Sequence, residues 1–203
     1  MLECFSYLRP SDANDLPAAV RETLVANGKT ATYEHVCAVA DVARALAARE
    51  GLCVQACEDA ALLHDVSAVI RPADMLAWMQ SQGAWVAEAE CRHPFLLHQR
   101  ISRILAAEDF AQTDERILSA VECHTTLKAD PSPYDLVVFL ADKISWDRAD
   151  DPPYRAAVER GLERSLAHAA LAYIDFTMDG GMILCPHPWL LQAREWLAAA
   201  CGA

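Results

Sequence analysis

The sequence predicts an all-α protein, and its composition and residue spacing both favour this fold class. Hydrophobic residues make up 54% of the 203 residues, whereas glycine occurs only 7 times. Alanine and leucine dominate the chain, and both favour helices. Apolar side chains recur every three or four residues, as in Val39, Val42 and Leu46, which places them on one helix face. We therefore expect helices packed on helices.

Glycine and proline divide the first half of the chain into helical segments. We expect helices over residues 15–27, 30–50, 55–66 and 75–82. Thr30 or Thr32 would cap the second of these helices, and Gly51 would end it. The segment from Gly83 to His93 reads as an acidic connector.

The second half continues the helical pattern. Pro94 suits the first turn of a helix, and Thr113 would cap the next one. After a break at residues 129–133, a strongly apolar helix would run from Asp135 to about Trp146. We expect one long helix over residues 154–177 and a last helix within residues 186–203.

The length fits one domain, and we expect residues 1–203 to form it. A core of about residues 30–178 would carry the N-terminal and C-terminal helices on its surface. We find no internal repeat, low-complexity segment or linker long enough to divide the chain.

The formal net charge of -12 disfavours a broad nucleic-acid-binding surface, which would need clustered lysine and arginine. A small phosphate substrate is compatible with this charge if a bound metal supplies positive charge locally. No apolar run is long enough to span a membrane. The first residues lack the basic start and apolar core of a secretory signal, so we expect a cytoplasmic protein.

Cysteine usage leaves two interpretations open. The chain has 8 cysteines but no C-x-x-C pair, since Cys53 and Cys57 are one residue too far apart. One interpretation is a thiolate zinc site. The other, which we favour, is that the cysteines are small buried hydrophobic residues in a reducing cytoplasm.

The segment from Asp59 to Ile70 contains the pair His64 and Asp65 directly after the apolar run Ala60–Leu63. An imidazole beside a carboxylate is costly to bury unless something compensates. A divalent metal compensates both groups at once, because neutral imidazole nitrogen and carboxylate oxygen are common metal ligands.

Further ligand-type residues stand in or at the end of apolar runs: His35, His98, His124 and Asp142. Each has a simpler interpretation when taken alone. His35 could bond a backbone carbonyl, and Lys143 could pair with Asp142. The set together predicts a metal centre. Four histidines and two aspartates exceed what one tetrahedral zinc needs and suit two ions of the iron or manganese type.

The order H…HD…H…H…D resembles the HD superfamily of metal-dependent phosphohydrolases, an all-α helical bundle. Within it, the chain is most similar to the bacterial symmetrical diadenosine tetraphosphate hydrolases. The resemblance covers about residues 33–177. Its motifs are A-A-L-L-H-D at 60–65, L-L-H at 96–98, H-T-T at 124–126 and A-D-K-I at 141–144.

The resemblance implies a role for each motif residue. His35, His64 and Asp142 would hold one metal, and His98 and His124 a second. Asp65 would bridge the two ions, which makes Asp65 and His64 the catalytic pair. A hydroxide bridging two divalent metals, iron in first place and manganese or another transition metal as the alternative, would attack one phosphorus. The dinucleotide would be cut to two molecules of ADP.

Lys143, Arg148, Thr125 and Lys128 would contact the nucleotide. For the charged residues among them, solvated surface charge is the other interpretation. We expect the protein to bind a small-molecule nucleotide rather than nucleic acid or a membrane. The sequence leaves open whether it forms a homodimer. We assign no role to His93, His168 or His187.

The sequence departs from the family pattern beside the motifs. Ala68 stands where the family usually has lysine, and Gln99 and Leu127 stand where glycine is usual. Residues 145–147 read S-W-D instead of a Glu-Pro-Gly run. All six ligand positions survive, so the metal centre is better supported than the substrate.

The alternatives are therefore an HD-domain enzyme for another nucleotide, or a nucleotide- or metal-binding regulatory protein without turnover. The plainest alternative is a helical domain whose histidines have only structural roles.

Overall fold

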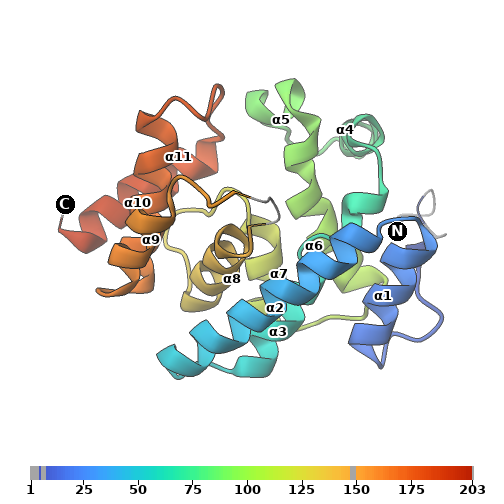
Figure 1. The fold of residues 1–203 in the computed structure, drawn as a ribbon. Helices are drawn as coiled ribbons and strands as arrows, with labels where there is room; N and C mark the ends of the chain where they lie inside the picture. The colour runs from blue at the N-terminus through green and yellow to red at the C-terminus, as the bar shows by residue number, and fades with distance from the viewer. Residues whose placement is uncertain (1–4, 6–7, 147–149, 203) are drawn as a thin grey trace.

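The computed structural model describes residues 5, 8–146 and 150–202, and within these ranges it confirms the all-α class (Figure 1). The described residues form α-helices and short 3-10 segments, with no strand among them. The α-helices are α1 Leu16–Ala26, α2 Thr30–Glu50, α3 Val54–Leu63, α4 Pro72–Ser81, α5 Glu88–Arg92, α6 His98–Glu108, α7 Glu115–Cys123, α8 Pro133–Ile144, α9 Arg155–Leu162, α10 Leu166–Asp179 and α11 Pro188–Cys201. Two 3-10 segments are η2 Val66–Val69 and η3 Pro94–Leu97. None of these described helices combines the length and the apolar character needed to cross a bilayer.

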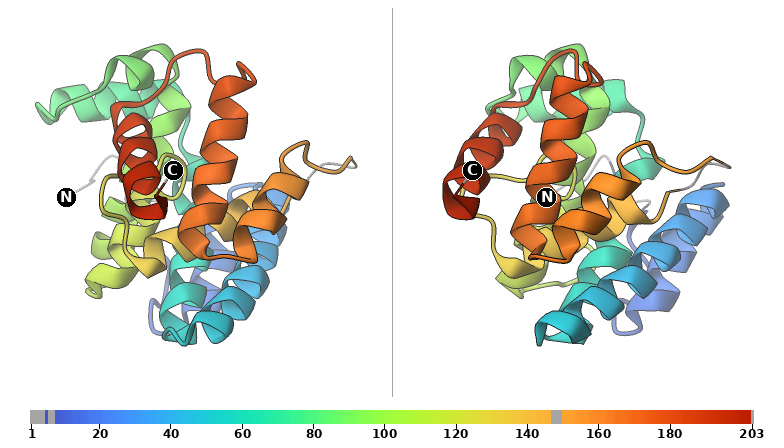
Figure 2. Two further views of the ribbon diagram at one scale, coloured as in Figure 1. Left: turned by 90° about the vertical axis from the view of Figure 1, so that its left-hand side faces the viewer. Right: turned by 60° about the vertical axis from the view of Figure 1, so that its left-hand side comes forward.

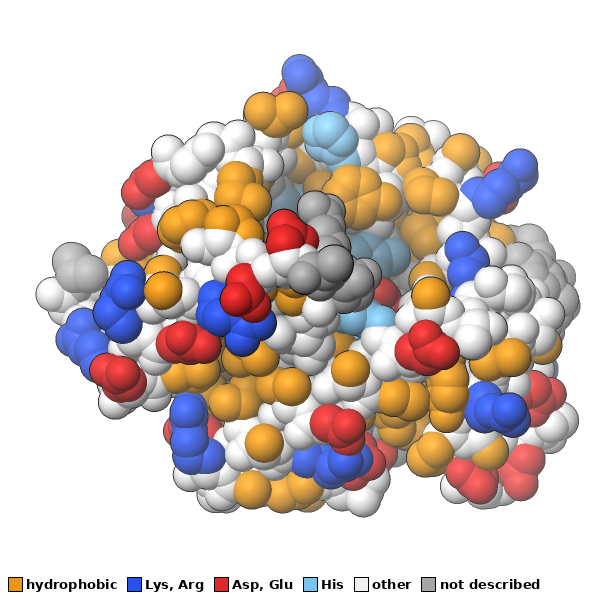
Figure 3. Space-filling view, viewed as in Figure 1, with side chains coloured by type: hydrophobic (Ala, Val, Ile, Leu, Met, Phe, Trp, Pro, Cys, Tyr) orange, Lys and Arg blue, Asp and Glu red, His pale blue; other side chains and the backbone are white. Residues whose placement is uncertain are grey.

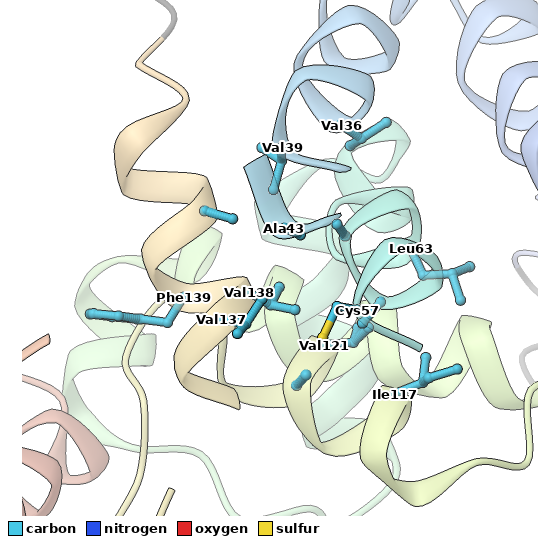
Figure 4. Packing of buried hydrophobic residues seen from close by; sticks show 14 of the residues in the cluster. Val36, Val39, Ala43, Cys57, Leu63, Ile117, Val121, Val137, Val138 and Phe139 are labelled. Carbon is cyan, nitrogen blue, oxygen red and sulfur yellow. The ribbon is translucent and has the colours of Figure 1, made fainter. Parts of the chain in front are cut away.

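The centre of the molecule is a bundle of α2, α3, α7 and α8, whose apolar faces meet (Figure 4). Each helix contributes fully buried side chains to this contact: Val39 and Ala43 from α2, Cys57 and Leu63 from α3, Val121 from α7, and Val138 from α8. Removal of these apolar surfaces from water is the main favourable term of folding. The four helices are therefore held together by one shared core.

The remaining helices pack around this bundle (Figure 2). Helix α1 lies on α2 and α3, while α10 packs on α8 and α9, and α11 packs on α10. One connected hydrophobic core includes Val20 of α1 and Leu197 of α11. The helices predicted near both termini therefore form and pack on the rest of the chain.

Two helix starts differ from the sequence prediction. Lys29, rather than Thr30 or Thr32, is the N-cap of α2, and its side chain makes no capping bond. Its backbone N–H instead donates to the carbonyl oxygen of Leu24, because the chain turns directly from α1 into α2. Asp114, rather than Thr113, caps α7, since its carboxylate accepts from the backbone N–H of Arg116 at 2.9 Å and also pairs with that side chain.

The single long helix predicted for residues 154–177 is wrong, because the chain reverses between α9 and α10. Ser165 is extended, and its Oγ accepts from the backbone N–H of His168 at 3.2 Å, which caps α10. The two helices pack closely at Gly161, where an added Cβ would lie 2.4 Å from the Cα of Ala169. Only glycine permits this backbone contact.

Two other segments also depart from the prediction. Helix α3 ends at Leu63 instead of Val66, so His64 is its C-cap and Asp65 lies beyond it. The acidic connector contains the short helix α5, and Glu90 within it is fully buried. Its carboxylate accepts from Arg100 and from the backbone N–H of Ala87, and these bonds compensate for its burial.

Candidate metal centre

The six histidine and aspartate residues singled out in the sequence converge at one end of the central helices. His35 lies in α2, His64 and Asp65 follow α3, His98 begins α6, His124 follows α7, and Asp142 lies in the last turn of α8. Figure 3 shows histidine side chains recessed in a hollow of the molecular surface. His64 and His124 are fully buried, whereas the other four side chains are partly exposed.

His35, His64 and Asp142 form the first group. Nε2 of His35 lies 3.1 Å from Oδ1 of Asp142, and Nε2 of His64 lies 3.8 Å from the same oxygen. One ligand atom from each residue lies within 4.8 Å of the other two. The group is the one that the resemblance assigns to a single metal, and its geometry would let one cation contact all three residues.

His64, Asp65 and His124 form a second group with the same spacing. His98 stands beside it, with its Nε2 at 2.9 Å from Nε2 of His124 and 3.4 Å from Oδ1 of Asp65. Oδ2 of Asp65 lies 3.8 Å from Nε2 of His64. Asp65 thus faces histidines of both groups, a position that suits the bridging role predicted for it.

Three of the imidazoles are oriented in the same way by the backbone. Nδ1 of His64, His98 and His124 lies 2.6, 2.5 and 2.8 Å from the carbonyl oxygens of Ala61, Phe95 and Val121, respectively. In each case the carbonyl can only accept, so Nδ1 carries the proton. In the neutral rings Nε2 then bears a lone pair that faces the cluster, as metal coordination requires.

Polar atoms without partners support a cation in this space. Nε2 of His64 and Oδ1 of Asp65 are buried and have no hydrogen-bond partner among the described residues. Such atoms are costly to leave unpaired. In addition, His64 and His124 cap the C-terminal ends of α3 and α7, and helix C-termini carry partial negative charge. The donor set and its surroundings therefore fit a divalent metal.

The electrostatics of the cluster favour the protonation states that metal ligands need. Burial raises the pKa of Asp65, but His64 and His98 outweigh burial, and the net shift is downward. The pKa of Asp142 is well below its usual value, because Lys143 and the hydrogen bond from His35 outweigh burial. Burial and the neighbouring imidazoles hold the pKa of His124 well below 6.5. Ionised carboxylates and a neutral imidazole result.

Gln99 and Leu127, which depart from the family pattern, support the ligand segments. Gln99 is fully buried, and its Oε1 accepts from the backbone N–H groups of Thr125 and Thr126 at 3.1 and 3.3 Å. Its Nε2 donates to Oγ1 of Thr126. Gln99 thus ties the start of α6, which carries His98, to the turn that follows His124. Leu127 adopts a positive φ of 55° in this turn, which explains why glycine suits the position.

The predicted substrate contacts have different surroundings. Oγ1 of Thr125 lies 3.1 Å from Nε2 of His98, so this hydroxyl is at the metal centre. Nζ of Lys143 donates to the Asp142 carboxylate and to the carbonyl oxygen of His124. Lys128 donates to Ser119 instead. Arg148 lies outside the described residues. Contact of these residues with substrate stays a prediction.

A cavity of about 410 Å³ adjoins the centre and is lined by Asp65 and His98. Ala68 lines it too, together with the cations Lys29 and Arg71, which our sequence analysis did not select. No local motif marks these two cations, because they lie in separate turns and only the fold brings them to one cavity.

The histidines assumed to have no role lie apart from the six ligand-type residues. His93 links α5 to η3, and Nδ1 of His168 pairs with Oγ of Ser165. His187 is buried beside Glu90, with Nε2 at 3.6 Å from Oε1. Among the described residues, neither candidate metal-binding group contains a cysteine. Only Cys57 and Cys123 of the described cysteines are buried, so the expectation of small buried hydrophobic residues is wrong for the others.

The helical bundle and its histidine–aspartate cluster define a class of protein, a helical domain with residues that could bind metal. The family model of the HD domain matches residues 32–147, so the chain belongs to the HD domain family.

Individual relatives support the family and its fold. The chain is 43% identical to an uncharacterized protein in the pepC 5′ region of Lactococcus lactis subsp. cremoris, over 67% of this chain and 69% of the relative. It is 29% identical to the symmetrical bis(5′-nucleosyl)-tetraphosphatase of Bacillus subtilis (strain 168), over 82% and 89% of the two chains. A solved structure from Clostridium acetobutylicum, described as a predicted HD superfamily hydrolase involved in NAD metabolism, superposes with a TM-score of 0.77. It is 24% identical and the match covers 92% of this chain and 97% of that one, which shows a shared fold.

Proposed function

We propose that this protein is a metal-dependent phosphohydrolase that cleaves a phosphoanhydride bond of a nucleotide, with diadenosine tetraphosphate giving two ADP as its reaction. The observation that carries this proposal is the convergence of six histidine and aspartate side chains, two of which, His64 and Asp65, have buried donor atoms without a partner among the described residues. The similarity to the symmetrical tetraphosphatase of Bacillus subtilis supports the choice of substrate.

His35, His64 and Asp142 would hold one divalent ion, and His98 and His124 a second, with Asp65 between them. We propose iron as the metal, with manganese as the alternative, because imidazole and carboxylate suit both. Bound ions would lower the pKa of a water molecule and neutralise charge on the phosphoryl oxygens.

The protein's own groups would orient the reaction. Lys143 keeps Asp142 ionised and is itself held by the carbonyl oxygen of His124. The hydroxyl of Thr125 is close enough to His98 to contact a phosphoryl oxygen above the centre. Lys29 and Arg71 border the adjoining cavity and would stabilise the rest of the phosphate chain.

A second candidate is an HD-domain hydrolase for a different nucleotide. The observation that favours it is the replacement of three family residues beside the centre by Ala68, Gln99 and Leu127. Ala68 lines the cavity next to Asp65, so its small side chain changes the space that a substrate would meet. A regulatory protein that binds nucleotide without turnover is the third candidate.

Product analysis separates these candidates. The protein is purified without oxygen, its metal content is determined, and it is incubated with diadenosine tetraphosphate, ATP, ADP and dinucleotides such as NAD. The proposal expects ADP as the sole product from diadenosine tetraphosphate. Cleavage of another member of the panel would move the function to the second candidate, and nucleotide binding without any product would contradict hydrolysis.

A further inference from the structure

A second cavity, of about 350 Å³, lies beside the metal centre and differs in chemistry from the first. Phe95, Thr125 and Tyr173 line it, and the segment before α11 closes it with Met182, Ile183 and Leu184. Among the described residues that line it there is no lysine, arginine, aspartate or glutamate. Its volume is in the range of small-molecule sites. His93 and His187 also line it, but it has none of the lysine or arginine that borders the first cavity, so it suits a flat, weakly polar ring better than a phosphate chain.

The position of this cavity links it to the proposed chemistry. Thr125 lines it and lies 3.1 Å from His98. Phe95 lines both cavities, and its ring stacks over His98 at an interplanar angle of 19°. The metal centre therefore lies beside both cavities, one with cations on its border and one mostly apolar.

A buried polar cluster holds the outer wall of this apolar cavity in place. His187, which is 1% exposed, ends the wall segment and lies 3.6 Å from Oε1 of Glu90. The Glu90 carboxylate also accepts from Nη1 of Arg100, which in turn donates to the carbonyl oxygen of Trp85. Burying such groups is costly. The cluster links residues 182–187, through His187, to α5 and α6, and Met182 and Leu184 of this segment are exposed.

We propose that this apolar cavity, lined by Phe95, Thr125, Tyr173 and residues 182–184, is the nucleobase subsite of the enzyme. The inference rests on the proposed function, since it assumes a nucleotide at the metal centre. A base would lie between the exposed ring of Phe95 and the apolar wall segment, while its phosphates extend past Thr125 toward the ligands. A bound ring would also remove the exposed apolar side chains of Met182 and Leu184 from water, which favours binding.

Cys185 permits a direct test, because it lines this cavity and is partly exposed. The metal-loaded protein is treated with iodoacetamide, and mass spectrometry follows the labelling rate of each cysteine with ADP, with inorganic pyrophosphate, or with neither. At about ten times its Kd, ADP should slow the labelling of Cys185 roughly tenfold. Pyrophosphate, which has no base, should leave Cys185 unchanged. Cys53 is exposed, is absent from both cavities and serves as the internal control.

A matched pair of variants gives a second readout. Met182→Gln combined with Leu184→Gln changes exposed wall residues without adding charge, and should weaken ADP binding about tenfold while sparing pyrophosphate. Leu191→Gln, at an exposed position of α11 outside both cavities, should change neither. Calorimetric titration measures both ligands.

The results distinguish failure of the subsite from failure of the function. Bound ADP with unprotected Cys185 would overturn the subsite, even if the enzyme turns over nucleotides. Equal losses of ADP and pyrophosphate binding in the double variant would also overturn it. Protection of Cys185 by ADP in a protein that hydrolyses no nucleotide would contradict the proposed reaction and retain the subsite.

Discussion

The Nε2 atoms of His98 and His124 lie 2.9 Å apart, although each ring also directs Nδ1 at a backbone carbonyl oxygen. If both Nδ1 atoms carry protons, both facing nitrogens carry lone pairs and repel each other. A proton on His124 would relieve this, but burial and its neighbours hold the pKa of His124 well below 6.5. A metal cation near both nitrogens would resolve the conflict, which is why this pair is central to the proposed function.

Substitution of Asp65 should remove both metal and activity. In Asp65→Ala, the carboxylate that faces His64, His98 and His124 is lost, so we expect turnover to be abolished and metal content to fall sharply. Helix content should be retained, because the Asp65 side chain caps no helix. Metal analysis, turnover and circular dichroism measure these three properties.

The matched control is Asp59→Ala, which removes a carboxylate from α3 that accepts from Gln55 outside the cluster. It should keep metal and turnover. Wild-type activity in Asp65→Ala would rule out the proposed centre.

Gln99 should matter for metal binding although it is not a ligand. Gln99→Leu leaves the backbone N–H groups of Thr125 and Thr126 without their acceptor. We expect a loss of about 2–4 kcal/mol in the free energy of unfolding, and a metal affinity about 10–100-fold weaker because the turn after His124 is released from α6. Denaturant unfolding and metal titration measure the two effects.

Gln55→Leu is the control, since Gln55 is exposed and its amide bonds only the carboxylate of Asp59, and it should change stability by less than about 0.5 kcal/mol. If Gln99→Leu loses stability but binds metal with wild-type affinity, Gln99 acts in the fold alone.

Leu127 offers a test of backbone strain. It is fully buried with a φ of 55°, a region that costs a residue with a Cβ about 1–2 kcal/mol. Leu127→Gly should relieve this strain but lose about 2–3 kcal/mol of apolar burial, for a net loss of about 1 kcal/mol. Leu127→Ala loses apolar burial but keeps the backbone strain, so chemical denaturation should show it to be less stable than Leu127→Gly. The opposite order would show that the left-handed conformation carries no strain here.

Glu90 should make stability depend on pH. Burial raises its pKa, but the nearby His187 and the bonds from Ala87 and Arg100 outweigh burial, so its folded pKa lies below 4.5. A carboxylate whose pKa is lowered by folding stabilises the fold at pH values above its pKa in the unfolded state. That contribution is lost as the pH falls through its pKa in the folded state. Glu90→Gln should therefore cost about 3 kcal/mol at pH 7, and its difference from wild type should shrink below pH 4.5.

Unfolding of the metal-free protein across this pH range measures the effect. Glu88→Gln, on the same short helix but exposed, is the control and should show a small, nearly constant difference. A constant difference for Glu90→Gln across the range would contradict the assigned pKa shift.

The positions of the six ligand-type residues could be predicted because each is a polar residue in or beside an apolar helical run. Other features depend on contacts between distant segments. Glu90 reads as a surface acid in an acidic connector, and its burial follows only from Arg100 and from His187, far along the chain. The three- to four-residue spacing of apolar side chains also continues across Ser165, so the sequence pattern does not separate α9 from α10. The reversal between these helices depends on the close contact at Gly161.

Anomalous diffraction from crystals grown without oxygen would test the central claim most directly. Data collected at the iron and manganese absorption edges would locate and identify any bound metal. The account predicts two peaks within the cluster, one beside His35, His64 and Asp142 and one beside His98 and His124, with Asp65 between them. A cluster without any anomalous peak, in protein that still hydrolyses the nucleotide, would contradict a metal-dependent reaction at this site.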